Sequence, residues 1–441
     1  MKAKLHVLLM ILVLSVLTAP VHAEGTGAIS PGDTAWVLIS AALVMLMTPA
    51  LGLFYGGMVR GKNVLATFLQ SFMMIGVVGV QWVLFGYTLA FGPDKWHLIG
   101  GLDWAGLRNV GLMPNPDYAP TIPHQAFMIY QAMFAIITPA LITGAFAERM
   151  RFKSFLIFTL LWATLVYDPV AHWVWAPGGW LRNLGALDFA GGTVVHVCSG
   201  MAALACALMV GKRKGYGKEE MQPHNLTMTI IGAATLWFGW FGFNAGSAMG
   251  ANGLAVSAFV VTNTSAAAGA LSWVFIEWWH RGKPTALGVA SGAVAGLVAI
   301  TPASGYVGPM AAIAIGAVVS LLCYGAIMLK DKLGYDDSLD VFGVHGVGGA
   351  WGAIATGLFA TKLINPAGSD GLFHGNPKLL IVQLLSVAAV FGYSFLMTSI
   401  LLKVTHVFSP LRVSHEDEHL GLDLSQHGET GYALRPIRGE V

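Results

Sequence analysis

The chain has 441 residues, of which 56% are hydrophobic and only 10% are charged. Soluble domains carry about 25% charged residues, so this composition excludes a soluble globular protein and indicates a polytopic membrane protein. The formal net charge of +2, without a basic patch, excludes a nucleic-acid-binding surface. The cysteines Cys198, Cys206 and Cys323 lie in apolar runs without metal-ligand spacing, which supports neither a disulfide framework nor a metal site.

The first segment has the pattern of a secretory signal peptide. Lys2 and Lys4 precede an apolar run from Leu8 to Leu17, and small residues follow up to Ala23. We therefore expect residues 1–23 to be a signal peptide that is removed. The alternative is an uncleaved additional helix, but its apolar run is short for a span of about 20 residues.

Apolar segments then recur up to residue 404, each close to the length that a helix needs to cross a bilayer. We predict an all-α polytopic membrane domain over residues 24–404, with about eleven transmembrane helices. The expected spans are 34–57, 63–91, 123–146, 154–175, 191–211, 226–247, 256–279, 285–300, 309–329, 340–361 and 378–404. Residues 405–441 are polar and are expected to form a tail.

The distribution of basic residues predicts the orientation of these helices. One set of loops contains Arg60 and Lys62; Arg149, Arg151 and Lys153; Lys212, Arg213, Lys214 and Lys218; Arg281 and Lys283; Lys330 and Lys332. The opposite set contains only Lys95, Arg108, Arg182, Lys362 and Lys378. Basic loops stay in the cytoplasm, so we expect the N-terminus outside and the tail inside, as an odd number of helices requires.

Two histidines lie at corresponding places in this pattern. The first five spans and the next five can form an inverted repeat, with the eleventh helix added. His196 belongs to the fifth span and His345 to the tenth, and both follow a Leu-Asp pair, at Leu187 and Leu339. One histidine among apolar residues is usually a satisfied core residue, but ionisable groups repeated inside a membrane domain indicate a functional site.

Aromatic residues accompany the histidines. Tyr130 and Phe134 share a helix face at spacing i, i+4, Trp175 ends the fourth span, and residues 240–247 close the sixth span with a hydroxyl at Ser247. An aromatic face attracts a small cation by about 0.5–2 kcal/mol. The alternative interpretation of these residues is an aromatic belt at the membrane surface.

Several segments of the sequence resemble motifs of a known family. The segments FYGGMVRGKN (54–63), GAFAERMRF (144–152), DFAGGTVVH (188–196), PHN (223–225), GWFGFNAGS (239–247) and DVFGVHG (340–346) are similar to motifs of the ammonium transporter family. The resemblance covers nearly all of the mature chain in order, includes LDLSQHG (422–428) in the tail, and is strongest for the bacterial branch.

The resemblance implies an outer recruitment site, two rings that close the pore below it, two histidines that line the conduit, and a supporting buried carboxylate. These are, in that order, Trp175, Ser247 and Tyr130; Phe134 and Phe243; His196 and His345; and Asp188. Bacterial transporters commonly have phenylalanine where this chain has Tyr130, so we expect its hydroxyl to add a hydrogen-bond partner at the entrance.

The resemblance also implies a substrate, an oligomeric state and a regulatory partner. We expect transport of ammonium or ammonia, with methylammonium as an analogue, by a homotrimer in lipid of the inner (cytoplasmic) membrane. We expect a PII-type nitrogen regulatory protein as partner of the cytoplasmic regulatory tail (405–441), with neither a cofactor nor enzymatic activity.

The predicted mechanism is recruitment of the cation, deprotonation near Asp188, and conduction of ammonia past His196 and His345. The residues leave open whether the proton follows. They also leave three alternatives: a membrane oxidoreductase whose two histidines ligate haem, a sensor without flux, and a channel for another uncharged substrate such as carbon dioxide.

Overall fold

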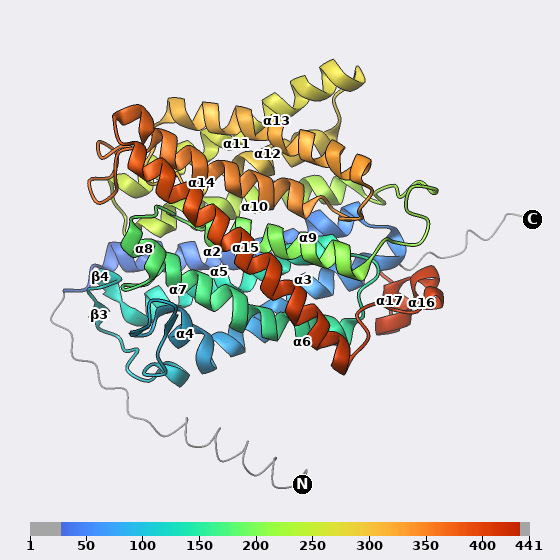
Figure 1. The fold of residues 1–441 in the computed structure, drawn as a ribbon, viewed down its shortest axis with the longest axis horizontal. Helices are drawn as coiled ribbons and strands as arrows, with labels where there is room; N and C mark the ends of the chain where they lie inside the picture. Colours follow the sequence, from blue (N-terminus) through green and yellow to red (C-terminus); the bar gives the residue numbers. More distant parts are fainter. Residues whose placement is uncertain (1–27, 433–441) are drawn as a thin grey trace, which may run out of the picture.

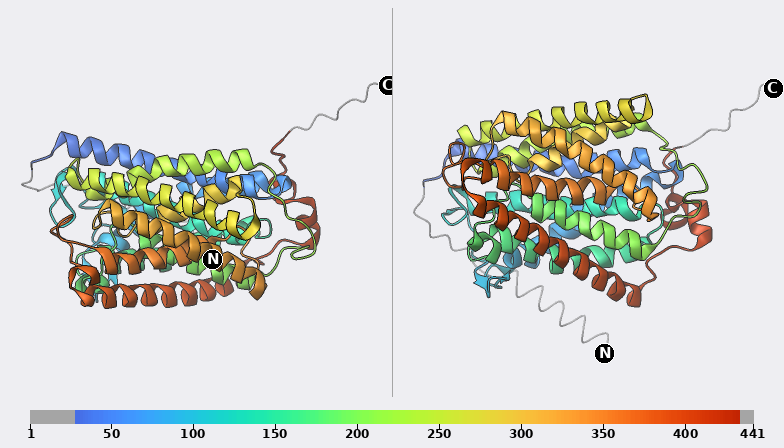
Figure 2. Two further views of the ribbon diagram at one scale, coloured as in Figure 1. Left: turned by 90° about the horizontal axis from the view of Figure 1, so that it is seen from above. Right: turned by 45° about the horizontal axis from the view of Figure 1, so that its top comes forward.

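The computed structural model describes residues 28–432, so the predicted signal peptide lies outside the described range. Long helices run side by side along the long axis of one bundle (Figures 1 and 2). Within residues 28–432, nine helical segments are long and apolar enough to cross a membrane. They are Pro31–Met58, Gly61–Phe91, His124–Phe146, Phe152–Leu184, Gly192–Val210, Leu226–Ala248, Gly253–Arg281, Pro309–Leu333 and Pro377–Phe408.

Two shorter helical segments complete the predicted set. They are α12 (Ala286–Ile300) and the pair η8 (Phe342–Val347) and α14 (Gly348–Phe359), at the places of the eighth and tenth predicted spans. The prediction of an all-α polytopic membrane protein is therefore confirmed. The last helix, α15 (Pro377–Phe408), runs four residues beyond the predicted end of its span.

The remaining α-helices follow one another along the chain. They are α2 (Pro31–Met58), α3 (Val64–Gln81), α4 (Tyr87–Phe91), α5 (His124–Ile142), α6 (Phe152–Trp162), α7 (Asp168–Trp175), α8 (Trp180–Leu184), α9 (Cys198–Val210), α10 (Leu226–Ala245), α11 (Gly253–Arg281), α13 (Pro309–Leu333), α16 (His415–Leu420) and α17 (Leu422–His427). Short 3₁₀ turns extend or connect some of them: η1 (Gly61–Asn63), η3 (Ala105–Leu107), η4 (Thr143–Phe146), η7 (Gly246–Ala248) and η9 (Leu372–His374).

In the part of the chain that the structure describes, four helical segments contain π-helical turns: η2 (Trp82–Gly86), η5 (Ala163–Tyr167), η6 (Gly192–Val197) and η8. A π-helical turn interrupts the regular hydrogen-bond ladder and is frequent at functional sites. Both histidines singled out in the sequence lie in such turns, His196 in η6 and His345 in η8.

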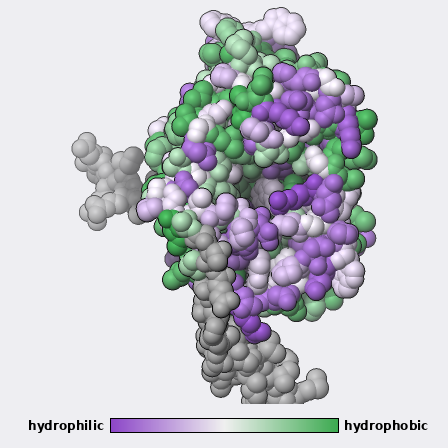
Figure 3. All heavy atoms as spheres, turned by 90° about the vertical axis from the view of Figure 1, so that its left-hand side faces the viewer, coloured by the Kyte–Doolittle hydropathy of each residue, from purple (hydrophilic) through white to green (hydrophobic). Residues whose placement is uncertain are grey.

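The two ends of the bundle differ. One end, called here the hairpin end, carries two small antiparallel hairpins, β1 (Asp94–Lys95) with β2 (Ile99–Gly100) and β3 (Pro114–Asn115) with β4 (Ala119–Pro123). Figure 3 views this end, where hydrophilic residues gather around a hollow. The opposite end, called the tail end, carries α16 and α17 (Figure 1).

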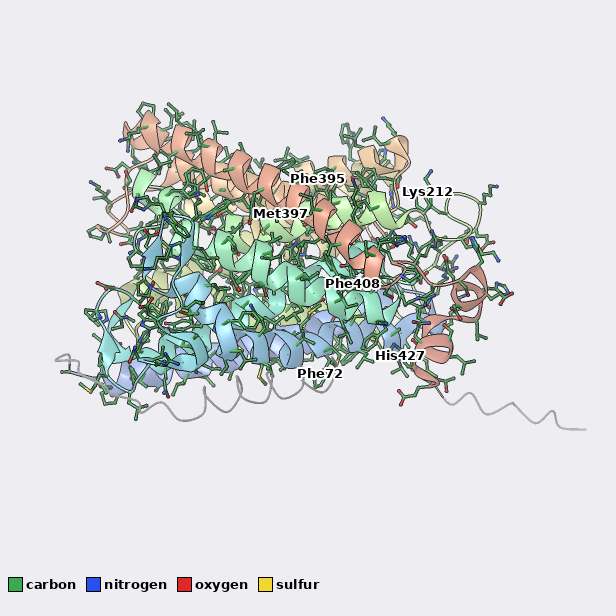
Figure 4. All side chains as sticks on the ribbon, turned by 60° about the horizontal axis from the view of Figure 1, so that its bottom comes forward. Phe72, Lys212, Phe395, Met397, Phe408 and His427 are labelled. Atoms are coloured by element: carbon green, nitrogen blue, oxygen red, sulfur yellow. The ribbon has the colours of Figure 1, made fainter. Side chains whose placement is uncertain are left out.

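The tail end is closed by contacts between the tail and the helical bundle. The carboxylate of Asp423 accepts hydrogen bonds from the backbone N–H groups of Leu65 and Ala66 at 3.0 and 2.7 Å, in the first turn of α3. Met150 pairs with Arg412 in a β-bridge, and Arg412 also contacts Glu418. Lys212, Phe408 and His427 all lie toward this end (Figure 4). The polar tail is thus packed against the bundle.

Helices α2 and α10 pack almost backbone to backbone because glycines of α10 face α2. A Cβ atom on Gly232 would lie 2.3 Å from the backbone nitrogen of Phe54, and one on Gly242 would lie 2.8 Å from the carbonyl oxygen of Ser40. Small residues permit such close approach between membrane helices. This packing sets the position of the hairpin-end half of α10, which carries Phe243.

Candidate functional site

A vestibule opens at the hairpin end of the bundle, with a volume of about 500 Å³. Its lining includes Phe134, Trp175, Asp188, Ser247 and Tyr306. These residues come from α5, α7, the loop before η6, η7 and the segment after α12, so only the folded bundle brings them together. The vestibule therefore contains Trp175 and Ser247, two of the three residues expected at the entrance.

Trp175 is the last residue of α7, and three contacts fix it there. Its indole N–H donates to the carbonyl oxygen of Asp188 at 2.8 Å. Its own carbonyl oxygen accepts a hydrogen bond from the guanidinium of Arg182. The backbone N–H of Ala176 donates to the carbonyl oxygen of His172 at 3.2 Å and closes the helix. With its N–H engaged, the indole offers the vestibule only its carbon surface and ring face.

The sequence suggested that the hydroxyl of Tyr130 offers a hydrogen-bond partner at the entrance. In the structure this hydroxyl contacts α10 and Ser247. Tyr130 is fully buried, and its Oη lies 2.9 and 2.8 Å from the carbonyl oxygens of Gly242 and Phe243. It also lies 3.1 Å from Oγ of Ser247. A phenol has one hydrogen to donate, so Tyr130 donates to a carbonyl of α10 and can accept from Ser247. Tyr130 supports the entrance from behind.

Two phenylalanine rings lie directly below the vestibule. The ring centroids of Phe134 and Phe243 are 4.3 Å apart at an interplanar angle of 37°, and both side chains are buried. Phe134 also contacts Trp175 edge to face, at 5.8 Å between centroids. This tilted pair of rings separates the vestibule from a narrow conduit on the other side.

His196 and His345 line this conduit and contact each other. Their Nδ1 atoms are 3.2 Å apart, and the rings are nearly parallel at 20°. The other lining residues are apolar: Met47, Leu51, Phe54, Ile137, Leu141, Val195, Leu236, Trp240, Phe243 and Val294. The free volume is only about 10 Å³, near the lower limit for one water molecule. The conduit is narrow and apolar apart from the imidazoles.

The contact between the histidines determines which hydrogen-bonding groups they present. A neutral imidazole has one N–H and one lone pair, so one Nδ1 donates to the other. The donor ring then has a lone pair at Nε2, and the acceptor ring has an N–H there. Nε2 of His196 has no partner within residues 28–432. The pair can therefore offer one donor and one acceptor to a small polar molecule.

Reciprocal close contacts hold the two histidine segments together. A Cβ atom on Gly200 would lie 2.2 Å from the backbone nitrogen of Gly346, and one on Gly349 would lie 2.7 Å from Cβ of His196. Gly200 follows His196 by four residues and Gly349 follows His345 by four. The same position in each half thus packs against the other half, as a pseudo-twofold relation requires.

Asp188 organises the start of η6. Its carboxylate accepts hydrogen bonds from the backbone N–H groups of Gly191, Gly192, Thr193 and Val194, at 2.6 to 3.2 Å. The hydroxyl of Thr193 donates to the same carboxylate. Both oxygens are thus occupied by the helix terminus that they stabilise, which favours a positioning role over that of a proton acceptor.

The counterpart of Asp188 in the second half is Asp337, which the match between the two Leu-Asp pairs missed. Asp337 accepts a hydrogen bond from the backbone N–H of Phe342, the first residue of η8, at 2.7 Å. Asp340, the aspartate of the second Leu-Asp pair, instead binds Nζ of Lys330 at 2.6 Å. The Leu-Asp match therefore aligned the wrong carboxylate. The usable signal was the equal spacing of eight residues from Asp188 to His196 and from Asp337 to His345.

A third cavity follows on the tail-end side of the histidines, with a volume of about 50 Å³. It shares Phe54, Val294 and His345 with the conduit, and Asp340 also lines it. Vestibule, conduit and inner cavity therefore lie in series from the hairpin end toward the tail end. Within the described part of the chain, no group of three or more His, Cys, Asp or Glu side chains could hold a metal ion.

Comparison with known proteins gives one consistent result. Residues 35–432 match the profile of the Ammonium Transporter Family. The ammonium transporter of Bacillus subtilis (strain 168) is 56% identical over 402 residues, which cover 91% of this chain and 98% of that protein. Ammonium transporter Amt1 of Archaeoglobus fulgidus is 49% identical over 403 residues, which cover 91% and 100%. The crystal structure of Saccharomyces cerevisiae Mep2 is similar with a TM-score of 0.85 at 38% identity, over 93% of each chain.

Proposed function

The chain belongs to the ammonium transporter family, and we propose that it moves ammonium across the cytoplasmic membrane along the line of cavities through its bundle. The observation that carries this proposal is the pair of contacting imidazoles, His196 and His345, in an otherwise apolar conduit. The vestibule on one side and the inner cavity on the other give this conduit two entrances.

Recruitment takes place at the vestibule. The face of Trp175 attracts the cation by a cation–π interaction of about 0.5–2 kcal/mol, and the hydroxyl of Ser247 accepts a hydrogen bond from one of its N–H groups. The single hydrogen of Ser247 is donated either to the carbonyl oxygen of Phe243 at 2.9 Å or to Oη of Tyr130 at 3.1 Å. Potassium lacks N–H donors, so the hydroxyl adds directionality that charge alone does not provide.

The conduit then selects against ions. A bare cation in a low-dielectric channel loses several kcal/mol of hydration free energy, and this penalty falls on potassium and ammonium alike. Ammonium can release a proton and continue as neutral ammonia, which potassium cannot do. Because five donors occupy the carboxylate of Asp188, we assign the proton to vestibule water or to the imidazole pair.

The imidazole pair guides ammonia through the conduit. One ring offers an N–H to the lone pair of ammonia, and the other offers a lone pair to an ammonia N–H. When the ring with the free Nε2 lone pair takes up a proton there, it can pass its Nδ1 proton across the 3.2 Å contact to the other ring, which releases its own Nε2 proton. This sequence reverses the two roles and provides a relay for a proton that follows.

The surroundings support an assignment of sides and partners. We assign the tail end to the cytoplasm because its loops carry most of the basic residues, and the hairpin end to the outside. Large apolar side chains are exposed on the flanks, such as Phe275 on α11 at 63% and Leu321 on α13 at 57%. Lipid and two further copies in a homotrimer would cover them, and the cytoplasmic face would receive a PII-type regulator.

Current recording on the reconstituted protein tests this function. An inward ammonium gradient should produce a saturable current or, for electroneutral passage, uptake with a pH change in the vesicle lumen. An equal potassium gradient and protein-free vesicles are the controls. Ammonium binding without current, uptake or pH change would favour the sensor alternative and contradict transport.

A further inference from the structure

A buried histidine outside the conduit lies close to the recruitment site. His172 belongs to α7, three residues before Trp175, and its side chain is fully buried. Its Nδ1 lies 3.0 Å from the carbonyl oxygen of Ala90, at the end of α4. Its Nε2 lies 2.9 Å from Oδ1 of Asp94, in strand β1.

Hydrogen counting shows what the two contacts of His172 require. A carbonyl oxygen accepts hydrogen bonds and donates none, so Nδ1 of His172 donates to Ala90. The contact between Nε2 and Asp94 then needs one more hydrogen, on either the imidazole or the carboxyl group. Both contacts are satisfied when His172 and Asp94 hold two hydrogens between them.

The hairpin that contains Asp94 is fastened to the segment around Trp175 by further contacts. Nδ1 of His97 lies 2.7 Å from the carbonyl oxygen of Gly178 and 3.3 Å from the other carboxylate oxygen of Asp94. The indole N–H of Trp173 donates to the carbonyl oxygen of Leu98 at 2.8 Å. The β1–β2 hairpin thus contacts α7 and the loop after it from several directions.

We propose that His172 is a positioning residue for Trp175: its imidazole pairs with Asp94, fastens the β1–β2 hairpin to the end of α7, and so holds the indole in the vestibule. This inference rests on the proposed recruitment role of Trp175. Without the hydrogen bonds of His172 the hairpin loosens. The affinity for ammonium then falls, while the conduit beyond the rings is unchanged.

The charged and titratable groups around His172 are consistent with this assignment. Asp94 and His97 face it from the hairpin, and Arg182 of α8 donates to the carbonyl of Trp175. The other nearby ionisable groups have their own neighbours: Asp168 binds Gln81, Tyr87 of α4 binds His124, and Lys95 and Asp103 approach Gly101. Asp94 is therefore the acid that His172 contacts.

Hydrogen exchange of the full-length purified protein tests this attachment of the hairpin without transport. Wild type, Asp94→Ala and His172→Ala are labelled at one pH. Peptides that cover residues 94–101 should lose protection in both variants, while those that cover the β3–β4 hairpin serve as an internal control. Equal protection of residues 94–101 in wild type and variants would overturn the proposal.

Transport of ammonium by matched variants tests the link to Trp175. Asp94→Ala and His172→Ala should each raise KM about threefold or more with an unchanged maximal current, so one variant suffices if the other does not assemble. Asp94→Asn should keep KM nearer the wild-type value, because a neutral His172 can donate to Ala90 and accept from the new amide. His374→Gln, an exposed histidine at the same end, is the control.

The outcomes separate this inference from the proposed function. A wild-type KM in Asp94→Ala or His172→Ala, or a parallel change of KM and maximal current, would overturn the positioning role. So would an equal rise of KM in Asp94→Asn and Asp94→Ala. Complete absence of ammonium flux would instead contradict the proposed function, whatever the exchange experiment shows.

Discussion

Asp188 and Asp337 occupy the same position in the two halves of the molecule. Each lies eight residues before a conduit histidine, and each accepts backbone hydrogen bonds from the start of the π-helical turn that carries it. Asp188 is the more heavily used: five groups donate to it, whereas Asp337 accepts from the backbone N–H of Phe342 at 2.7 Å. The first half therefore depends more strongly on its carboxylate than the second.

This asymmetry leads to a prediction for the carboxylates. Asp188→Ala should destabilise the protein by about 2 kcal/mol or more, because it leaves several buried N–H groups without partners. Asp337→Ala should cost less. Thermal unfolding in detergent gives the comparison, with Asp340→Ala as the control carboxylate that contacts Lys330. Equal losses for Asp188 and Asp340 would contradict the structural role of Asp188.

For the histidine pair, we predict that a carboxylate and an alanine have different effects. His345→Ala keeps the conduit apolar, so ions stay excluded while the ammonium current falls. His196→Asp or His345→Glu places a negative charge and water in the conduit and lowers the barrier for a bare cation, so potassium should permeate. Currents measured for each variant under ammonium and under potassium test these expectations. A full ammonium current in the double alanine variant would show that the imidazoles only fill space.

For the recruitment site, we predict that Trp175→Leu raises KM without a matching loss of maximal rate. The cation–π interaction is at most about 2 kcal/mol, so the rise is limited to roughly thirtyfold. Concentration dependence of ammonium or methylammonium flux measures it. Trp180→Leu changes a neighbouring tryptophan that packs on Trp173 and should leave KM near the wild-type value. Tyr130→Phe should be mild, since it removes only the buried hydroxyl.

For the tail, the position of a truncation should matter. A stop after Val413 removes α16 and α17 but keeps the β-bridge between Met150 and Arg412, so we expect folded protein with altered flux or regulation. A stop after Val404 also removes the end of α15 and this bridge, and it should lower thermal stability as well. Size-exclusion chromatography and flux measurements separate the two effects. Identical flux with and without α16 and α17 would leave the tail without a regulatory role.

A further prediction concerns acid stability at the tail end. Burial opposes ionisation of Asp336, but the hydrogen bonds and positive charge of Arg213, with the charge of Arg149, outweigh it and lower the pKa of this carboxyl. A lowered pKa contributes stability above the ordinary value and loses it as the pH falls through the folded-state value. Asp336→Asn should therefore cost about 3 kcal/mol at neutral pH.

The melting temperatures of wild type and Asp336→Asn should begin to approach each other below about pH 4, near the ordinary pKa of an aspartate. They should converge as the pH falls through the lower folded-state pKa, because Asp336 is then protonated in the folded protein as well. Melting curves between neutral and acidic pH check this expectation. Asp331→Asn, a more exposed carboxylate close to Lys330, is the control. A constant difference between wild type and Asp336→Asn at every pH would show that Asp336 acts through packing and not through charge.

Much of the architecture was determined by the sequence itself. Eleven apolar segments predicted eleven helices at nearly the right residues, because a bilayer imposes one length and one composition on every helix that crosses it. The matching positions of His196 and His345 predicted that the two imidazoles belong to one site, because ionisable groups are costly inside a membrane domain. These inferences need no knowledge of which helix lies beside which.

Contacts between distant segments were decided only by the tertiary structure. The hydroxyl of Tyr130 hydrogen-bonds to carbonyl groups of α10, more than a hundred residues away, and contacts the entrance only through Ser247. The pairing of His172 with Asp94 also joins separate segments. Asp337, not Asp340, proved to be the counterpart of Asp188, because a carboxylate can cap a helix only where the chain turns it back toward the first N–H groups. Local sequence patterns do not specify that geometry.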